Sequence, residues 1–174
     1  IRALILTLEN KMKVLKNCLI LLCFLPFTSL AEELITEKLI ENLISNIEEA
    51  AKRQDVEQLI TYFVNDAKVT FEFSGSQGGK MELDLLGYKE HLKQGWSMPM
   101  KFGYQVDDIA ISISGNGKSA EVTDLVTETI TMDGEIIMTT RTYEKIEIIN
   151  VRGLPMITRV YGLIMTGNKA EPVI

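Results

Sequence analysis

The pair Asp133-Gly134 separates two long segments in which apolar and polar residues alternate. Alternation with a period of two residues is typical of a β-strand that buries one face. A two-residue turn between such strands needs positive φ at both central positions, which Asp and Gly tolerate better than most residues. We therefore predict a β-hairpin in which Met132 lies opposite Glu135. Similar segments before and after it extend the prediction to a four-stranded antiparallel meander over residues 102–114, 119–131, 135–149 and 156–165.

The hairpin turn also predicts which side chains share a face of the sheet. If the pairing continues without interruption, Val126 lies opposite Arg141 and Asp124 lies opposite Tyr143. One face is then mostly apolar, with four polar side chains set into it: Asp124, Glu128, Arg141 and Tyr143.

The same pairing can be extended across the loop at residues 115–118 to the strand that precedes it. Pairing of Ser114 with Ser119 adds three isoleucines to the apolar face: Ile109, Ile111 and Ile113. The opposite face is rich in threonine, including Thr127 and Thr140, and is either solvated or covered by a second subunit.

Helices are predicted before the meander. Over residues 34–51, apolar residues recur every three or four positions with Glu and Lys between them, which indicates an amphipathic helix. Asp55 is suited to cap a second, short helix over residues 56–63, and Gln58 lies three residues on, where its side chain can reach back to the cap.

A strand and a third helix follow. Residues 67–73 alternate as a half-buried strand does, and residues 74–79 predict a flexible loop. Asp84 is suited to cap a helix that ends near Gly95, and residues 96–99 link it to the meander.

The first part of the chain has the composition of a targeting segment. Residues 12–31 combine a basic start, a short apolar run and small residues before a break, which predicts a secretory signal peptide cleaved after Ala31. The apolar run is shorter than a membrane-spanning helix needs, so no permanent membrane anchor is expected. Residues 1–11 precede the first methionine and are interpreted as an upstream over-extension. We expect one domain over residues 32–168, a tail over residues 169–174, and a periplasmic or secreted protein.

Charge and side-chain chemistry narrow the function. Removing residues 1–31 takes away four of the eighteen basic residues and one of the twenty-four acidic residues, which leaves a net charge of −9. Such a surface repels phosphate backbones, so nucleic acid is not an expected partner. Both cysteines lie in the removed segment and the chain has a single histidine, which disfavours a transition-metal site. Residues 77–80 lack the glycine and hydroxyl spacing of a phosphate loop, and no cofactor is expected.

Three motifs resemble the nuclear transport factor two-like superfamily, which includes the SnoaL-like polyketide cyclases and the ketosteroid isomerases. They are the run Gln54-Asp55-Val56-Glu57-Gln58-Leu59-Ile60-Thr61-Tyr62-Phe63-Val64-Asn65-Asp66-Ala67-Lys68-Val69, the run Gly87-Tyr88-Lys89-Glu90-His91-Leu92, and Arg159-Val160-Tyr161-Gly162. The resemblance implies an α+β cone, also called a cystatin-like roll, in which a curved antiparallel sheet packs against three N-terminal helices. It also implies a pocket for a small apolar or amphipathic ligand and a homodimer formed through the sheet.

The residues of the isomerases do not carry over to this chain. The position that resembles their general base is Phe71, the position of their oxyanion-hole tyrosine is Ile47, and the third position falls approximately at Arg141. Proton abstraction beside a carbonyl needs a base and a donor to the developing oxyanion, and apolar side chains replace both. We therefore expect a binding protein rather than an isomerase.

The predicted polar face leaves two interpretations open. Arg141 could form a structural ion pair with Asp124 or Glu128 beside the hydroxyl of Tyr143, because buried charges need partners. Alternatively, the same four side chains could bind a ligand carboxylate or position a water for a lyase, isomerase or hydrolase.

Aromatic residues and the single histidine complete the candidate site. His91 is expected at the surface or rim, or as an acid or base in an enzyme. Phe71, Tyr88 and Trp96 are expected to line the pocket, with Trp96 as a core plug or a lid. The remaining class of function is a protein-interaction module that uses the threonine-rich face.

Overall fold

The computed structural model describes residues 34–74 and 78–166, and this part of the chain contains three helices and six strands. In chain order the elements are α2 (Glu37–Lys52), α3 (Val56–Ile60), β1 (Phe63–Phe73), β2 (Lys80–Asp84), α4 (Leu85–Trp96), β3 (Lys101–Ile113), β4 (Ser119–Met132), β5 (Glu135–Val151) and β6 (Leu154–Thr166). The predicted signal peptide at residues 12–31, the predicted over-extension at residues 1–11 and the tail at residues 169–174 lie outside the described residues.

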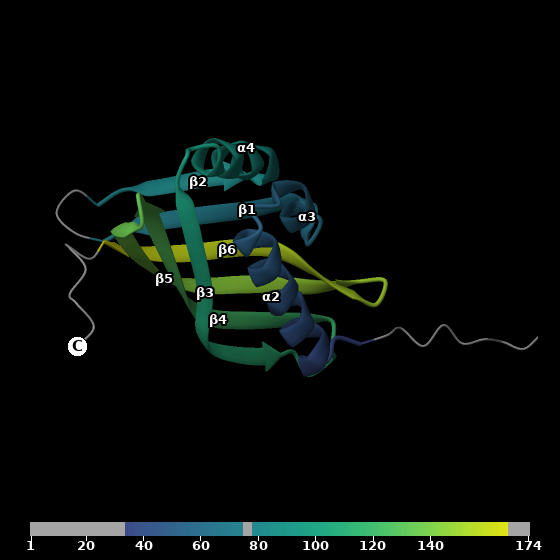
Figure 1. Ribbon diagram of the computed structural model, residues 1–174. Helices are drawn as coiled ribbons and strands as arrows, with labels where there is room; N and C mark the ends of the chain where they lie inside the picture. The colour runs from purple at the N-terminus through teal and green to yellow at the C-terminus, as the bar shows by residue number, and fades with distance from the viewer. Residues whose placement is uncertain (1–33, 75–77, 167–174) are drawn as a thin grey trace, which may run out of the picture. The chain divides into compact units, whose positions relative to one another are not determined.

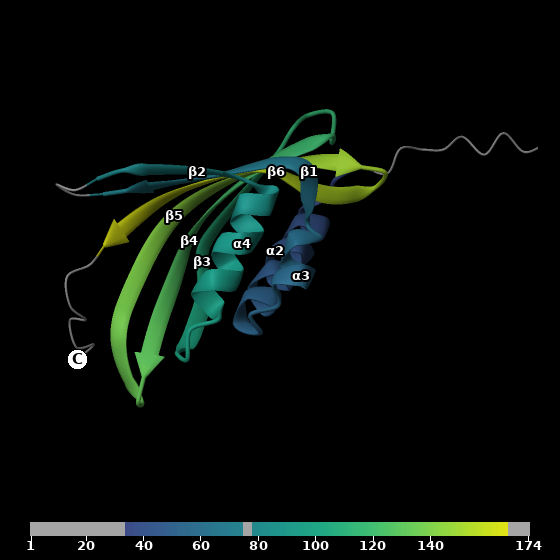
Figure 2. The same cartoon turned by 90° about the horizontal axis from the view of Figure 1, so that it is seen from above.

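The strands form one curved sheet in the order β2-β1-β6-β5-β4-β3. All neighbouring strands are antiparallel except β1 and β6, which run parallel, so the sheet is mixed rather than wholly antiparallel. Strands β3 to β6 form the predicted meander. The three helices lie on the concave side of the sheet, which confirms the predicted α+β architecture (Figures 1 and 2).

The core lies between the helices and the sheet. Residue Ile40 of α2, Ile148 of β5 and Ile157 of β6 are almost completely buried in it. Helix α2 forms because Thr36 caps it, with the Leu39 amide donating to Thr36 Oγ1 at 3.3 Å, and because its apolar residues lie on one face.

The predicted turn and caps are present. Asp133 and Gly134 have φ values of 52° and 87°, and Met132 pairs with Glu135. The Gln58 amide donates to Asp55 Oδ1 at 2.9 Å, although the Gln58 side chain donates to the Tyr62 hydroxyl instead of reaching back. At the start of α4, the Gly87 amide donates to Asp84 Oδ1 at 2.8 Å.

The predicted register of the β4–β5 hairpin is wrong beyond its first two pairs. Thr131 pairs with Ile136, but Ile130 pairs with Met138, so Ile137 forms a β-bulge. Because side chains alternate between faces, one extra residue moves every later residue of β5 to the other face. Arg141 therefore lies opposite Thr127.

The exchange of faces decides which residues of β5 point toward the helices. Thr142 and Glu144 lie on the concave face, opposite Val126 and Asp124 of β4. Arg141 and Tyr143 are exposed on the convex face, where the side chain of Tyr143 is 52% exposed.

A second bulge corrects the prediction for β3. Ile111 and Ile113 pair with Val122 and Ala120 as expected, but the register shifts between Asp107 and Ala110. Asp108 has a φ of 54°, a left-handed conformation that Asp tolerates. Ile109 consequently lies on the surface, with 47% exposure, instead of on the apolar face.

Two boundaries differ from those expected. The second helix ends at Ile60 rather than residue 63, because Phe63 is already paired with Ile157 of β6. Strand β2 is absent from the predicted elements, although Met81 and Leu83 alternate with polar residues. Five residues give too short a pattern to distinguish a strand from a loop.

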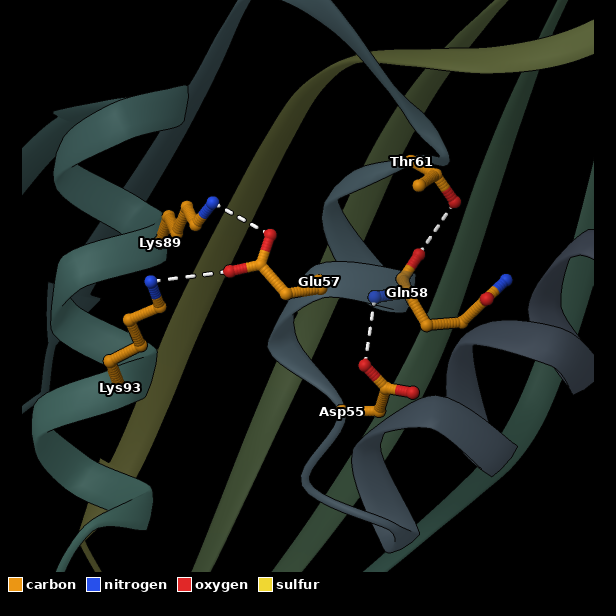
Figure 3. Close-up of polar contacts among 6 residues, drawn as sticks. All are labelled: Asp55, Glu57, Gln58, Thr61, Lys89 and Lys93. Carbon is orange, nitrogen blue, oxygen red and sulfur yellow. Dashed lines mark hydrogen bonds and ion pairs between the residues drawn. The ribbon is translucent and has the colours of Figure 1, made fainter.

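An exposed ion-pair cluster joins α3 to α4 (Figure 3). Glu57 of α3 accepts from Lys89 Nζ at 2.8 Å and lies 3.2 Å from Lys93 Nζ, both on α4. The hydrogen bond from Lys89, followed by that from Lys93, lowers the pKa of the Glu57 carboxyl. Because solvent screens exposed pairs, the cluster orients the two helices more than it stabilises the protein.

Substitution of Gly162 tests the packing of β6 against its neighbours. A Cβ atom there would lie 2.9 Å from both Phe71 Cδ1 and Thr142 Cγ2. We expect Gly162→Ala to lower the free energy of unfolding by about 1–3 kcal/mol in urea denaturation, since overpacking forces side chains out of their rotamers. Gly95→Ala in α4 meets nothing within 4 Å and should be neutral or stabilising by up to about 1 kcal/mol. Equal effects of the two substitutions would contradict this packing.

Candidate functional site

A cavity of about 330 Å³ lies between the concave face of the sheet and the helices. Its walls are mostly apolar, and they come from α2, α3, α4 and the strands β1, β2, β3, β4, β5 and β6. The apolar and aromatic lining consists of Ile47, Ala51, Leu59, Phe63, Phe71, Phe73, Met81, Tyr88, Leu92, Trp96, Tyr104, Val126, Ile146, Ile157, Val160 and Ile164. Cavities of this size and chemistry hold small apolar ligands in other proteins.

Aromatic rings cluster on the side of the cavity that α4 covers. The ring of Tyr88 lies 5.7 Å from that of Phe63 and 6.3 Å from that of Phe71, between centroids, and both pairs are tilted. Tilted pairs at this separation are favourable because the positive edge of one ring meets the negative face of the other. Phe71, Tyr88 and Trp96 all line the cavity.

Three carboxyl groups lie on the concave face. Asp124 and Glu144 are directly opposite each other on β4 and β5, and Glu128 lies opposite Tyr104 of β3. Glu128 and Glu144 line the cavity, while Asp124 is buried beside Glu144. Like charges in directly opposed positions destabilise a sheet when both are ionised. The arrangement therefore favours the protonated form of at least one of them.

Burial changes the acidity of this carboxyl cluster, defined as Asp124, Glu128 and Glu144. Desolvation raises the pKa of Asp124 to about 6 and also raises the pKa of Glu128. The pKa of Glu144 is raised to about 8, first by desolvation and then by the charges of Asp124 and Glu128. Burial also raises the pKa values of the Tyr88 and Tyr104 hydroxyls, which both lie near Glu144 and Glu128. Glu144 consequently keeps its proton near neutral pH.

Asp124 has an unusual environment for a carboxyl group. Its side chain is 5% exposed, and its Oδ1 atom has no hydrogen-bond partner within the described part of the chain. A buried, unpartnered oxygen costs free energy that an apolar side chain of similar size would not cost. A group of this kind needs an explanation beyond stability.

The predicted partner of these carboxyls is elsewhere. Arg141 was expected to pair with Asp124 or Glu128 beside Tyr143, but the bulge at Ile137 places Arg141 and Tyr143 on the convex face. Both the ion-pair interpretation and the four-residue binding cluster are therefore wrong in their geometry.

The remaining predicted positions lie at the cavity. Ile47 and Phe71, which replace the isomerase donor and base, both line it, and His91 is exposed at its rim. Glu144 and Thr142 are cavity residues that the predicted register puts on the other face. The alternation of Ile146 and Ile148 with the charged residues 145 and 147 is the signal that could have found them, because it places even-numbered residues of β5 in the core.

Two kinds of site are not present in residues 34–74 and 78–166. No group of three or more His, Cys, Asp or Glu side chains there is placed to hold a metal ion. None of the helices in the same ranges has the length and apolar character needed to cross a membrane.

Comparison with known proteins connects this chain with solved structures only. No family model matches the sequence, and no curated protein matches it. A candidate scytalone dehydratase from Novosphingobium aromaticivorans superposes with a TM-score of 0.57 at 16% identity, covering 79% of this chain and 87% of that one. An NTF2-like protein of unknown function from Pseudomonas putida gives a TM-score of 0.59 at 12% identity, covering 78% and 89%.

A third structure carries the other name of the fold. A cystatin-like protein of unknown function from Nostoc punctiforme has a TM-score of 0.55 at 14% identity, and 82% of this chain covers 99% of that one. At such identities the similarity establishes architecture and leaves activity open. The curved sheet, the helices on its concave face and these superpositions show that this chain has the fold of the nuclear transport factor two-like superfamily.

Proposed function

We propose that this protein binds a small, largely apolar molecule in the cavity between the sheet and the helices. The observation that carries the proposal is the cavity itself, about 330 Å³ with an aromatic and aliphatic lining. A packed protein interior leaves few voids larger than a water molecule, so a cavity of this volume points to an occupant. The predicted signal peptide supports a site of action in the periplasm or outside the cell.

The single tryptophan offers a direct test. Trp96 lines the cavity and is the only tryptophan in the chain, so its fluorescence reports on that site alone. We expect an apolar naphthalene dye to shift the Trp96 emission saturably with one site per chain. We also expect native mass spectrometry of protein taken from its native source to show a bound species of a few hundred daltons, on the order expected for a pocket of this class.

Matched substitutions separate binding in the cavity from binding at the surface. Ile164 lines the cavity, whereas Ile137 is 52% exposed at the tip of the β4–β5 hairpin. Ile164→Phe should weaken dye binding about tenfold or more by filling the cavity, and Ile137→Phe should leave it unchanged. Loss of binding in the Ile137 variant, or no loss in the Ile164 variant, would place the dye elsewhere.

The carboxyl cluster favours a second candidate, an acid-base lyase or isomerase. A general acid or base works best when its pKa lies near the operating pH, and the pKa of Glu144 is raised to about 8. Tyr88 and His91 lie at the same cavity, and one structural neighbour is a candidate dehydratase. Turnover of a hydroxylated aromatic substrate that is lost in Glu144→Gln, with dye binding retained, would establish this candidate in place of simple binding.

A further inference from the structure

The carboxyl cluster has no counter-ion in the described part of the chain. No Lys, Arg or His side chain of residues 34–74 and 78–166 forms an ion pair with Asp124, Glu128 or Glu144, and none of the cavity-lining residues is Lys or Arg. The ion pairs that do form involve other acids, such as the exposed Glu57, which pairs with Lys89. The acidic groups of the interior are thus left without the positive charge that buried acids usually have.

The cavity wall presents two carboxyls, Glu128 and Glu144, and Glu144 lies opposite a third, buried carboxyl. Asp124 is 95% buried on the concave face, beside Glu144, and its Oδ1 accepts no hydrogen bond. A carboxylate oxygen needs a donor, and the two carboxyls on the cavity wall need a positive charge. A protonated amine supplies both, because it carries three N–H donors and one positive charge in a volume near that of a methyl group.

We propose that the molecule bound in the cavity is an apolar amine, whose ammonium group binds to the carboxyls of Glu144 and Glu128 on the cavity wall while its apolar body packs against Phe71, Tyr88 and Trp96. This inference rests on the proposed binding function and specifies the chemical class of the ligand. Aromatic faces near the cluster also favour a cation. A neutral or anionic apolar ligand would leave the same carboxyls unpaired.

The ionisation of the cluster supports this assignment. In the empty protein, desolvation and the charges of Asp124 and Glu128 favour the protonated form of Glu144, and an incoming cation removes that advantage. The other titratable groups that line the cavity are Tyr88 and His91 of α4 and Tyr104 of β3, and the residues of α2 and α3 that line it are apolar. Asp124 and Glu144 also border a second, more open pocket together with Asp108, Tyr143, Lys145 and Tyr161, and Lys145 is paired there with Glu121. Binding of an ammonium ion near pH 7 should therefore release a proton from Glu144 into the buffer.

The test compares molecules of one shape and different charge. Phenethylamine, 2-phenylethanol and 3-phenylpropanoate are titrated at pH 7 into the intact protein, with Trp96 fluorescence and calorimetry as readouts. Because hydrogen bonds to charged groups are worth more than neutral ones, we expect the amine to bind about 10-fold to 100-fold more tightly than the alcohol, and the carboxylate to bind most weakly. The binding enthalpy of the amine, and not that of the alcohol, should depend on the ionisation enthalpy of the buffer.

Variants locate the charge. Glu144→Gln and Glu128→Gln keep the side-chain shape and should each reduce the preference for the amine, whereas Glu90→Gln on the exposed side of α4 should not. Far-ultraviolet circular dichroism checks that each variant is folded, and Asp124→Asn provides a third, independent change within the cluster.

The outcomes separate this inference from the binding function. Equal affinities for amine and alcohol, or an amine preference that survives all three cluster variants, would overturn the assignment of the ligand class and leave the binding function standing. If the naphthalene dye also fails to bind, the binding function itself is overturned.

Discussion

The variant Glu144→Gln is expected to be more stable than the natural protein at pH 8 and to lose the part of the pH dependence of stability that Glu144 contributes. The pKa of the Glu144 carboxyl rises from 4.5 in the unfolded chain to about 8 in the folded protein, because burial and the neighbouring Asp124 and Glu128 disfavour the carboxylate. Between these two pH values the unfolded chain has released the proton while the folded protein still holds it. The contribution of Glu144 to stability is therefore fully present below about pH 4.5 and is lost as the pH rises to about 8.

The size of the effect follows from the shift. At about 1.4 kcal/mol per pKa unit, the change at Glu144 corresponds to about 5 kcal/mol, and water that enters the cavity reduces it, so we expect a loss of about 2–5 kcal/mol between pH 5 and pH 8. Glutamine has no proton to lose and should remove that loss. Urea denaturation of both proteins across this pH range measures it.

The control for this prediction is an acid outside the core. Glu90 is exposed on α4, so Glu90→Gln should follow the pH dependence of the natural protein within about 0.5 kcal/mol. If Glu144→Gln is destabilised at pH 8, or if its pH dependence equals that of Glu90→Gln, then Glu144 is not held in the protonated form by its surroundings.

The second large effect concerns neighbouring residues on opposite faces of β5. Thr142 is 4% exposed and lines the cavity, and Arg141 is exposed on the convex face. Thr142→Asp adds a fourth acid to the concave side, without a counter-ion, and should lower the free energy of unfolding by about 3–5 kcal/mol. Arg141→Asp makes the same new side chain one residue earlier and should change it by about 0.5 kcal/mol or less.

This comparison discriminates between two registers of the hairpin. Under uninterrupted pairing from the Asp133-Gly134 turn, Arg141 would face the helices and the order of the two effects would reverse. Chemical denaturation of the two variants at pH 7 shows which register is present, and equal m-values check that both unfold in two states. A larger loss for Arg141→Asp would restore the uninterrupted register and remove Glu144 from the cavity.

The sequence predicts the architecture well because strong local signals repeat. The Asp55 and Asp84 caps, the amphipathic pattern of α2 and the turn at Asp133 each specify their element without reference to the rest of the chain. Agreement among such signals is what lets a sequence specify one fold. The superposition with solved structures supports the fold that these local signals predict.

The site is harder to predict, because it depends on one residue without a local signal. Ile136, Ile137 and Met138 are consecutive apolar residues, so alternation does not show which of them leaves the ladder. The burial pattern of Ile146 and Ile148 puts even-numbered residues of β5 in the core, whereas uninterrupted pairing from the turn puts odd-numbered residues there. Only a bulge between the turn and Ile146 reconciles the two patterns. The bulge on β3 is equally hard to predict, because the alternation of apolar and polar residues does not show that Asp108 has a positive φ.

The bulge at Ile137 has a consequence for how pockets of this architecture can diversify. A single-residue insertion or deletion near the tip of a long hairpin exchanges the two sets of side chains that a strand presents to either side, while its composition stays the same. In β5, Arg141 and Tyr143 would take the places of Thr142 and Glu144 on the concave face. One codon gained or lost at a distance from the binding region could thus replace an interior glutamate with an arginine and a tyrosine in a single evolutionary event, a change that would otherwise take several simultaneous replacements.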